Sequence, residues 1–329
     1  MKFIFFILLL FSQMSFAKDY LLYKPDRPNI DPLEYYVNGA YDVIQNPYYF
    51  SQENFFKKHE TLFKRIGSPI HSIEKDGGFK KFFQDEFTTT RVVPNLTLHL
   101  IGGGYDVRLM QEYFEYKGAE FPLAYAITFS YLAHFGNEAL ELTNHNITSH
   151  DNIADLFVFD IAAIYLFQND DVVKFFRDTL SMNHWHSQPI LELDQFNVTN
   201  AGLNYIFRPN VFKTNFRPFL FLGMQTLAGV SYEVEEKKFY TLAAGMALTD
   251  PLKQKGRFVV GMFYDKDDFL NASLFINGGE DYRYRLNLHP EFLKTKRLGQ
   301  YGLLIGQKKD RDLVLGLKWK LPIGIGVKF

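Results

Sequence analysis

The stretch LVLGLKWKLPIGIGVKF, residues 313–329, carries the strongest structural signal in the chain. Every odd position from Leu313 to Phe329 is apolar, whereas the even positions are glycine, lysine or proline with one exception. Successive side chains of a strand point to opposite faces, so the pattern predicts a strand with one apolar face and one small or cationic face. Pro322 cannot donate a hydrogen bond within a sheet. The segment is therefore either one long strand or two strands joined by a turn at 320–322.

The same alternation recurs from residue 188 onward. In residues 239–248, for example, alternate positions are Tyr240, Leu242, Ala244, Met246 and Leu248. The predicted strands are 191–198, 201–208, 218–227, 239–248, 257–264, 269–276, 282–288, 298–305 and 311–329, with 231–235 as a further candidate. Segments of this length, separated by polar turns, match the strands of a membrane barrel.

These segments predict a mainly β fold with α: an antiparallel transmembrane β-barrel of about 10 strands (about 8 to 12) over residues 188–329, preceded by a helical region. A soluble antiparallel sandwich or barrel is the alternative that the pattern leaves open.

The N-terminus has the pattern of a secretory signal peptide. Met1-Lys2 is a basic start, residues 3–11 are apolar, and Ser15-Phe16-Ala17 offers small residues for a peptidase. We therefore expect cleavage of residues 1–17 after Sec-type export. The chain has no cysteine, which excludes a disulfide scaffold and thiolate chemistry. A net charge of -1 gives no indication of nucleic acid as a partner.

Two helical regions are expected before the strands. Residues 18–91 are rich in aromatic side chains at helical spacing and predict a periplasmic helical segment. Residues 92–187 begin with a short alternating strand signal at 96–100, followed by three glycines that we interpret as a bend or bulge. The apolar segments 121–133 and 153–167 are too short or too charged to span a bilayer. They predict a helical hairpin, a plug of the barrel lumen, or helices that lie in the inner leaflet.

A polar stripe follows the first apolar segment. His134, Glu138, Glu141 and His145 are spaced by four, three and four residues, so one helix would place all four on a single face. Two imidazoles and two carboxylates on one face are a candidate ligand set for a divalent metal, or an acid–base set. A solvated helix face is the simpler interpretation of the same stripe.

Three more candidate catalytic residues follow: His150, Asp151 and Asp155. Asp151 is also a natural N-cap for the next helix. Asp160 lies on the opposite side of an unbroken helix from Asp151, so the spacing assigns it to something else. No GxSxG motif, zinc-protease HExxH or phosphate loop is present.

The middle of the chain resembles a family of uncharacterised bacterial outer-membrane β-barrel proteins with a helical N-terminal or plug section. The resemblance covers about sixty residues, and its motifs are His99 near the glycines, KGAEFP at 117–122, Asn137-Glu138 with Glu141, and HDNIADL at 150–156. The C-terminal strand resembles the closing strand of such barrels, in which Phe329, Val327 and Ile325 would be the assembly signal. The resemblance implies location and architecture, and no activity.

Three functions are therefore expected as alternatives. The first is a bacterial outer-membrane β-barrel with a structural role or a role in small-molecule passage or binding. Its partners would be outer-membrane lipid, the barrel-assembly machinery and a small-molecule ligand. The second is a lipid-acting hydrolase or metal-dependent enzyme centred on the stripe, with a divalent metal as cofactor. The third is a soluble periplasmic β-rich binding protein.

Overall fold

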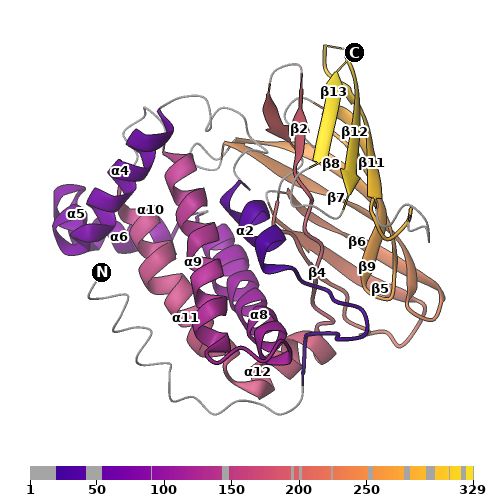
Figure 1. The fold of residues 1–329 in the computed structure, drawn as a ribbon, viewed down its shortest axis with the longest axis horizontal. Helices are drawn as coiled ribbons and strands as arrows, with labels where there is room; N and C mark the ends of the chain where they lie inside the picture. Colours follow the sequence, from indigo (N-terminus) through magenta and orange to yellow (C-terminus); the bar gives the residue numbers. More distant parts are fainter. Residues whose placement is uncertain are drawn as a thin grey trace.

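The computed structural model describes residues 20–41, 54–89, 91–142, 148–193, 196–199, 202–223, 225–250, 255–277, 282–293, 301–310, 312–319 and 324–328. The predicted signal peptide, His145 and Phe329 lie outside these ranges. A helical layer and a curved sheet lie side by side in this mixed α/β structure (Figure 1).

The helical layer begins with short, capped helices. Asp31 accepts hydrogen bonds from two backbone amides at the start of α2 (Pro32–Ala40), and Asn54 does the same for α4 (Phe55–Gly67). The other elements of this layer are α5 (Pro69–Lys75), α6 (Gly78–Phe87), α7 (Val92–Pro94), η2 (Asn95–Gly103), α8 (Gly104–Tyr116), α9 (Pro122–Glu141), α10 (His150–Ala154), η3 (Asp155–Phe159), α11 (Asp160–Phe167), α12 (Asp170–Lys174) and η4 (Phe175–Thr179). The elements labelled η are π-helical turns.

The strand predicted at 96–100 is wrong. These residues lie in η2, which joins α7 and α8 into one continuous helix through helical backbone angles. A short run of alternating leucines fits a helix or a strand, and periodicity alone does not distinguish them.

The three glycines that follow are helical rather than a bend. A side chain at Gly102 would overlap the ring of Tyr205, and one at Gly104 would overlap the ring of Phe167. The glycines therefore allow close approach between this helix and its neighbours. Both apolar segments predicted as helices are helical, in α9 and in α10 to α11. Both α9 and α11 pack against α8, and the two segments also contact each other through η3 and the hydrogen bond between His134 and Asp160.

In the part of the chain that the structure describes, the sheet contains thirteen strands: β1 (Asn183–His184), β2 (Ile190–Glu192), β3 (Asn197–Thr199), β4 (Tyr205–Phe207), β5 (Phe216–Leu222), β6 (Gln225–Glu235), β7 (Lys238–Asp250), β8 (Lys255–Lys266), β9 (Phe269–Ile276), β10 (Tyr282–Leu288), β11 (Tyr301–Lys308), β12 (Leu313–Trp319) and β13 (Gly324–Lys328). From β4 to β13 each strand pairs antiparallel with the next. Residues 313–319 and 324–328 form two antiparallel strands, with Val314 opposite Lys328, so the two-strand alternative is confirmed. The turn predicted at 320–322 lies outside the described residues.

The predicted closed barrel is wrong. The strand order runs from β1 at one edge to β3 at the other, and these edge strands do not pair within the residues described. Five residues, 185–189, carry the chain from β1 to β2 at the far side of the sheet, so the sheet is curved. The short strands at the β1 edge bind the helical layer instead: His184, His186 and Tyr205 all contact Asp106 of α8.

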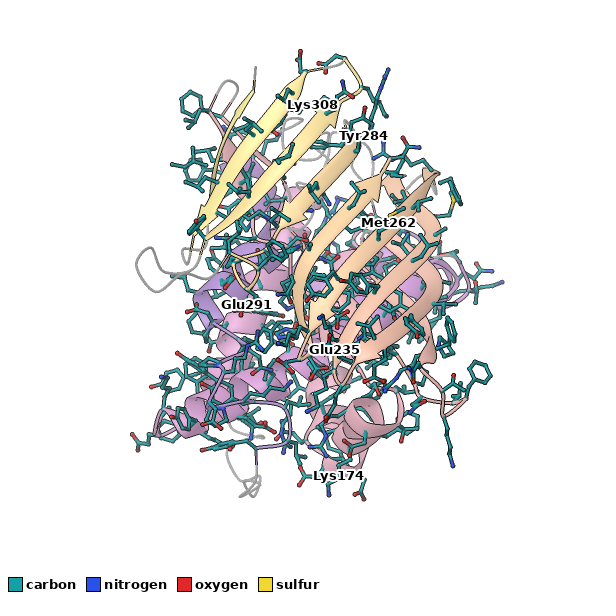
Figure 2. All side chains as sticks on the ribbon, turned by 90° about the vertical axis from the view of Figure 1, so that its right-hand side faces the viewer. Lys174, Glu235, Met262, Tyr284, Glu291 and Lys308 are labelled. Atoms are coloured by element: carbon teal, nitrogen blue, oxygen red, sulfur yellow. The ribbon has the colours of Figure 1, made fainter. Side chains whose placement is uncertain are left out.

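The two faces of the sheet differ in polarity. We call the side turned away from the helices the outer apolar face; Figure 2 views it, with Met262 and Tyr284 labelled. Its exposed apolar side chains are Val230, Tyr232, Tyr240, Leu242, Met246, Phe258, Met262, Ile276, Tyr284, Ile305, Leu313, Leu315, Leu317 and Ile325. The inner face buries aromatic rings together with polar and charged groups, which are Ser231, Thr241, Asp265, Asn271, Ser273, Arg285, Asn287, Lys308 and Lys318.

The main hydrophobic core lies between the helices and the β4 edge. Tyr35, Leu109, Met110, Phe167 and Tyr205 are almost fully buried there. Among the described residues, no helix is both long enough and apolar enough to cross a membrane.

Candidate metal centre

A cluster of buried titratable side chains lies inside the helical layer. His99 comes from η2, His134 and Glu138 from α9, Asp155 from η3 and Asp160 from α11. Each of these residues is at most 8% exposed. Residues far apart in the sequence therefore meet where the glycine-rich helix packs closely against its neighbours.

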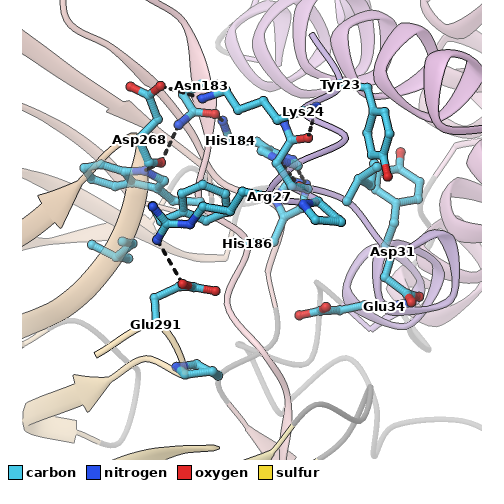
Figure 3. Close-up of a pocket in the computed structure, with 18 of the residues that line it drawn as sticks. Tyr23, Lys24, Arg27, Asp31, Glu34, Asn183, His184, His186, Asp268 and Glu291 are labelled. Carbon is cyan, nitrogen blue, oxygen red and sulfur yellow. Dashed lines mark hydrogen bonds and ion pairs between the residues drawn. The ribbon is translucent and has the colours of Figure 1, made fainter. Parts of the chain in front are cut away.

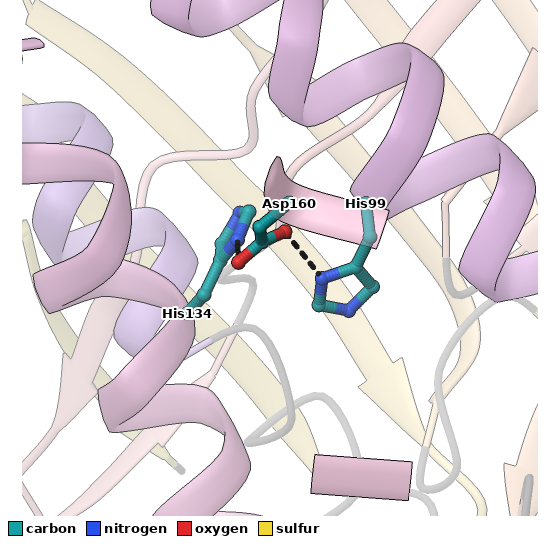
Figure 4. A group of neighbouring side chains, drawn as sticks. All are labelled: His99, His134 and Asp160. Carbon is teal, nitrogen blue, oxygen red and sulfur yellow. Dashed lines mark hydrogen bonds and ion pairs between the residues drawn. The ribbon is translucent and has the colours of Figure 1, made fainter. Parts of the chain in front are cut away.

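Asp160 forms hydrogen bonds with the imidazoles of both His99 and His134. Its Oδ1 lies 3.1 Å from His99 Nδ1 and its Oδ2 lies 2.8 Å from His134 Nδ1 (Figure 4). Burial raises the pKa of Asp160, but the charge of His134 and the hydrogen bonds from both rings outweigh burial and lower it to about 2. An ionised carboxylate only accepts hydrogen bonds, so each Nδ1 carries the proton. The Nε2 of a neutral His99 is then a bare lone pair.

That lone pair faces two carboxylates. His99 Nε2 lies 3.5 Å from Asp155 Oδ2 and 3.9 Å from Glu138 Oε1. Glu138 Oε2 accepts a hydrogen bond of 2.8 Å from Asn152, whereas the buried Oδ1 of Asp155 has no hydrogen-bond partner among the described residues. Burial and then the repulsion of neighbouring carboxylates raise the pKa of both Glu138 and Asp155 above their ordinary values.

The surroundings add further negative charge. Ligand atoms of Glu138, Glu141 and Asp151 lie within 4.8 Å of one another. Arg91 binds Glu86 at 2.8 Å and lies 3.7 Å from Asp151.

The pKa of Glu86 reflects this crowding. Burial raises it, Asp151 raises it further, and Arg91 only partly opposes them, so the pKa is about 7. Arg65 is a second cation whose charge acts on Glu138 and Asp151. The carboxylates of this cluster still outnumber Arg65 and Arg91.

A second group of histidines lies at the β1 edge. Asp106 Oδ1 is 3.2 Å from His184 Nδ1, and its Oδ2 is 3.2 Å from His186 Nε2 and 2.7 Å from the Tyr205 hydroxyl. The backbone N–H of Asn204 donates to His186 Nδ1, so the proton of a neutral His186 is on Nε2, directed at Asp106. That tautomer is a hydrogen-bond donor and not a metal ligand. Burial lowers the pKa of His186, although Asp106 opposes the shift.

These histidines line a cavity of about 490 Å³ between the helices and the sheet (Figure 3). Tyr35 lines the same cavity and connects the two groups. Its hydroxyl lies 3.3 Å from His134 Nε2, and its ring centroid is 6.0 Å from that of His186. Polar contacts thus lead from the cavity through Tyr35, His134 and Asp160 to His99.

The described residues of the polar stripe predicted on one helix have different neighbours in the structure. Glu138 faces His99, Glu141 lies beside Glu138 and Asp151, and His134 instead joins Asp160 and Tyr35. His145 lies outside the described residues.

The other predicted site residues are also divided. Asp155 enters the centre, whereas His150 binds Asp85 at 2.9 Å and is not among the groups around His99. Sequence spacing missed Asp160 and gave His99 no role, because it relates residues of one helix and not of three.

Comparison with known proteins gives no match: no family model, no curated protein and no solved structure resembles this chain. The function is therefore inferred from the site itself.

Proposed function

We propose that this chain is a metalloprotein of the bacterial envelope that binds one divalent cation between His99, Glu138 and Asp155. One observation carries the proposal: an imidazole lone pair faces two buried carboxylates, neither of which forms an ion pair with an arginine or lysine of the described residues. Buried charge of one sign is costly unless it is paired, protonated or bound to a metal.

The ligand chemistry and the spacing fit such an ion. One imidazole nitrogen and two carboxylate oxygens suit first-row divalent metals. An ion held at about 2.1 Å from each ligand keeps neighbouring ligand atoms roughly 3.0–3.5 Å apart. The distances of 3.5 and 3.9 Å from His99 Nε2 therefore need little contraction. A metal-binding imidazole is commonly oriented by a carboxylate that binds its other nitrogen and does not touch the metal. Asp160 has this position relative to His99.

Metal titration tests this proposal. The full chain, purified in detergent and stripped by chelator, is titrated with Mn²⁺ and Zn²⁺ in a calorimeter. We expect one site, and an affinity at least about 100-fold lower in the double variant E138Q/D155N, because both anionic ligands are lost. E60Q is the control, because Glu60 is an exposed carboxylate of α4 that pairs with Lys64, one turn further along the same helix. Wild-type affinity in the double variant would refute the proposal.

Acid–base catalysis at this ion is the second candidate function. The contacts from Tyr35 through His134 and Asp160 to His99 favour it, because they form a path for a proton between the cavity and the metal ligands. Release of fatty acid from phospholipid vesicles is the assay. H134Q is expected to retain the metal and to lower the rate about 100-fold. Equal rates in wild type and E138Q/D155N would exclude this activity.

We further propose that the outer apolar face contacts the lipid of the bacterial outer membrane. Along the middle of β6 to β12 the outward side chains are apolar, while charged groups such as Asp265, Arg285 and Lys318 point inward. This polarity is opposite to that of a water-soluble sheet, in which charged groups face outward. Lipid is the surrounding that suits such a face.

Single cysteines test the location cleanly, because the chain has none of its own. A fluorophore on L242C should be quenched by lipid-borne quenchers in reconstituted vesicles. The same fluorophore on T241C, the neighbouring inward position, should not be quenched. Equal quenching at both positions, or recovery of the protein without detergent, would contradict lipid contact.

A further inference from the structure

Two buried cations on the inner face of the sheet form no ion pair among the described residues. Arg285 of β10 is 3% exposed and Lys318 of β12 is 0% exposed. Lys318 Nζ donates to Asn287 Oδ1 at 3.4 Å, and Arg285 lies over the rings of Phe275 and Tyr282. The Nε of Arg285 has no hydrogen-bond acceptor in the described part of the chain. The carboxylate of Glu34, which lines the cavity between the helices and the sheet, attracts Lys318 but forms no ion pair with it.

Other buried cations of the same face are paired. Arg208 binds Asp265 with two hydrogen bonds of 2.9 and 2.8 Å, and Lys308 binds Glu192 at 2.6 Å. These two buried cations are therefore neutralised by an acid within ion-pair distance. Arg285 and Lys318 are exceptions, and an unpaired buried cation calls for an anion from outside the chain.

The sheet register gathers hydrogen-bond donors beside them. Lys318 is paired with Gly302 of β11, which has no side chain, so the lysine extends across β11 to Asn287 on β10. Asn287 donates to Ser273 at 3.1 Å, and the Ser273 hydroxyl lies 3.2 Å from His289 Nε2. We call Arg285, Asn287, Lys318, Ser273 and His289 the basic patch.

The basic patch adjoins the cavity. His289 lines it, next to Glu291. Two cations that line the cavity are already neutralised, because Lys24 binds Asp268 at 2.6 Å and Arg27 binds Glu291 at 2.9 Å. A third, Lys117, lies over the rings of Tyr113 and Tyr116. An anion that enters this cavity therefore finds unpaired positive charge beyond His289, not at Lys24 or Arg27.

We propose that the basic patch binds the phosphate group of a ligand that enters through this cavity. A guanidinium offers paired donors that match phosphate oxygens, and an ammonium adds a point charge. Burial and the charge of Arg285 lower the pKa of Lys318 to about 7, and a bound anion would favour its protonated form, so that the two groups together balance a phosphate dianion. This site is separate from the metal centre and requires neither a bound cation there nor lipid on the outer face.

Binding to the full chain in detergent, in buffer without phosphate, tests the patch. The probes are inorganic phosphate, glycerol phosphate, and vesicles of phosphatidylcholine with or without phosphatidic acid. We expect R285Q to weaken phosphate binding at least about tenfold, because a buried charged donor is lost. R283Q is the matched control: Arg283 lies on the same strand but is exposed, and its loss should change nothing.

A thermal measurement keeps the test meaningful if one variant folds poorly. K318M removes an unpaired buried charge, so without ligand it should melt no lower than wild type, while its phosphate-induced rise in melting temperature disappears. Binding of the soluble phosphates identifies a phosphate ester as ligand class, and binding of phosphatidic acid vesicles alone identifies a lipid headgroup. No binding of any probe to wild type, or equal loss in R283Q and R285Q, would overturn the proposal.

Discussion

The helical layer and the inner face of the sheet both bury charge, with opposite sign. Around His99 the carboxylates outnumber the cations, whereas Arg285 and Lys318 on the sheet form no ion pair among the residues described. The comparison shows that charge balance, rather than concavity alone, distinguishes the two candidate binding sites. The first predicts a cationic ligand and the second an anionic one.

The largest expected effect is on stability, and it distinguishes a buried cation with an acidic partner, Arg208, from one without an ion pair, Arg285. R208M leaves Asp265 buried without its partner and should lower the free energy of unfolding by about 3–5 kcal/mol. R285M removes a cation that has no acid to leave behind, so it should not destabilise the ligand-free protein. Chemical denaturation of both variants measures the difference. Equal destabilisation would show that Arg285 is paired in the folded protein, and the contrast between the two cations would fail.

The pH dependence of stability tests the acidic cluster. Burial and Asp151 raise the pKa of Glu86 to about 7, so protonated Glu86 contributes stability that is fully present below its unfolded pKa. That contribution is lost as the pH rises from about 4.5 through 7, and it amounts to up to about 3 kcal/mol. Chelator-treated protein should therefore be less stable at pH 8 than at pH 5, and E86Q should flatten the slope. An unchanged slope in E86Q would place the titration elsewhere.

Several strands were predictable because each depends on its own alternation, whereas the predicted strands 191–198 and 218–227 each cover parts of two strands. Residues 269–276 and 282–288 form β9 and β10 with the predicted bounds, and the apolar set at 313–317 lies on one exposed face. The failure of the sheet to close into a barrel was not predictable, because closure depends on whether the two edge strands pair. The short β1 and β4 offer few backbone groups, and their side chains bind Asp106 of α8.

The candidate site was predictable only in part. Glu138 and Asp155 stood out from the sequence as polar residues beside apolar helices, and both enter the centre. His99 and Asp160 did not, because their roles arise from contacts between η2, α9 and α11. Those contacts depend on the close approach that Gly102 and Gly104 permit, and no spacing within one helix contains this information.

Two histidine–aspartate pairs sharpen the assignment of the metal centre. Asp160 binds His99, whose other nitrogen faces Asp155, whereas Asp85 binds His150, which lies outside the centre. D160N should lower metal affinity about 10- to 100-fold through loss of the orienting carboxylate, and D85N should leave it unchanged. Calorimetric titration compares them. Equal affinity in the two variants would show that His99 is not a ligand.

The smallest expected effect concerns the glycines that bring the helices together. A methyl group at Gly102 would overlap the buried Tyr205 ring, so G102A should cost about 1–3 kcal/mol in unfolding free energy. The methyl group of G103A would lie 3.1 Å from His134 Cε1, which a small shift of that ring relieves. G103A should therefore remain close to wild type in stability, yet change metal binding slightly, because His134 shares Asp160 with His99. Thermal denaturation combined with metal titration resolves the two effects. A G102A variant as stable as wild type would mean that the helical layer and the β4 edge do not pack as closely as the acidic cluster requires.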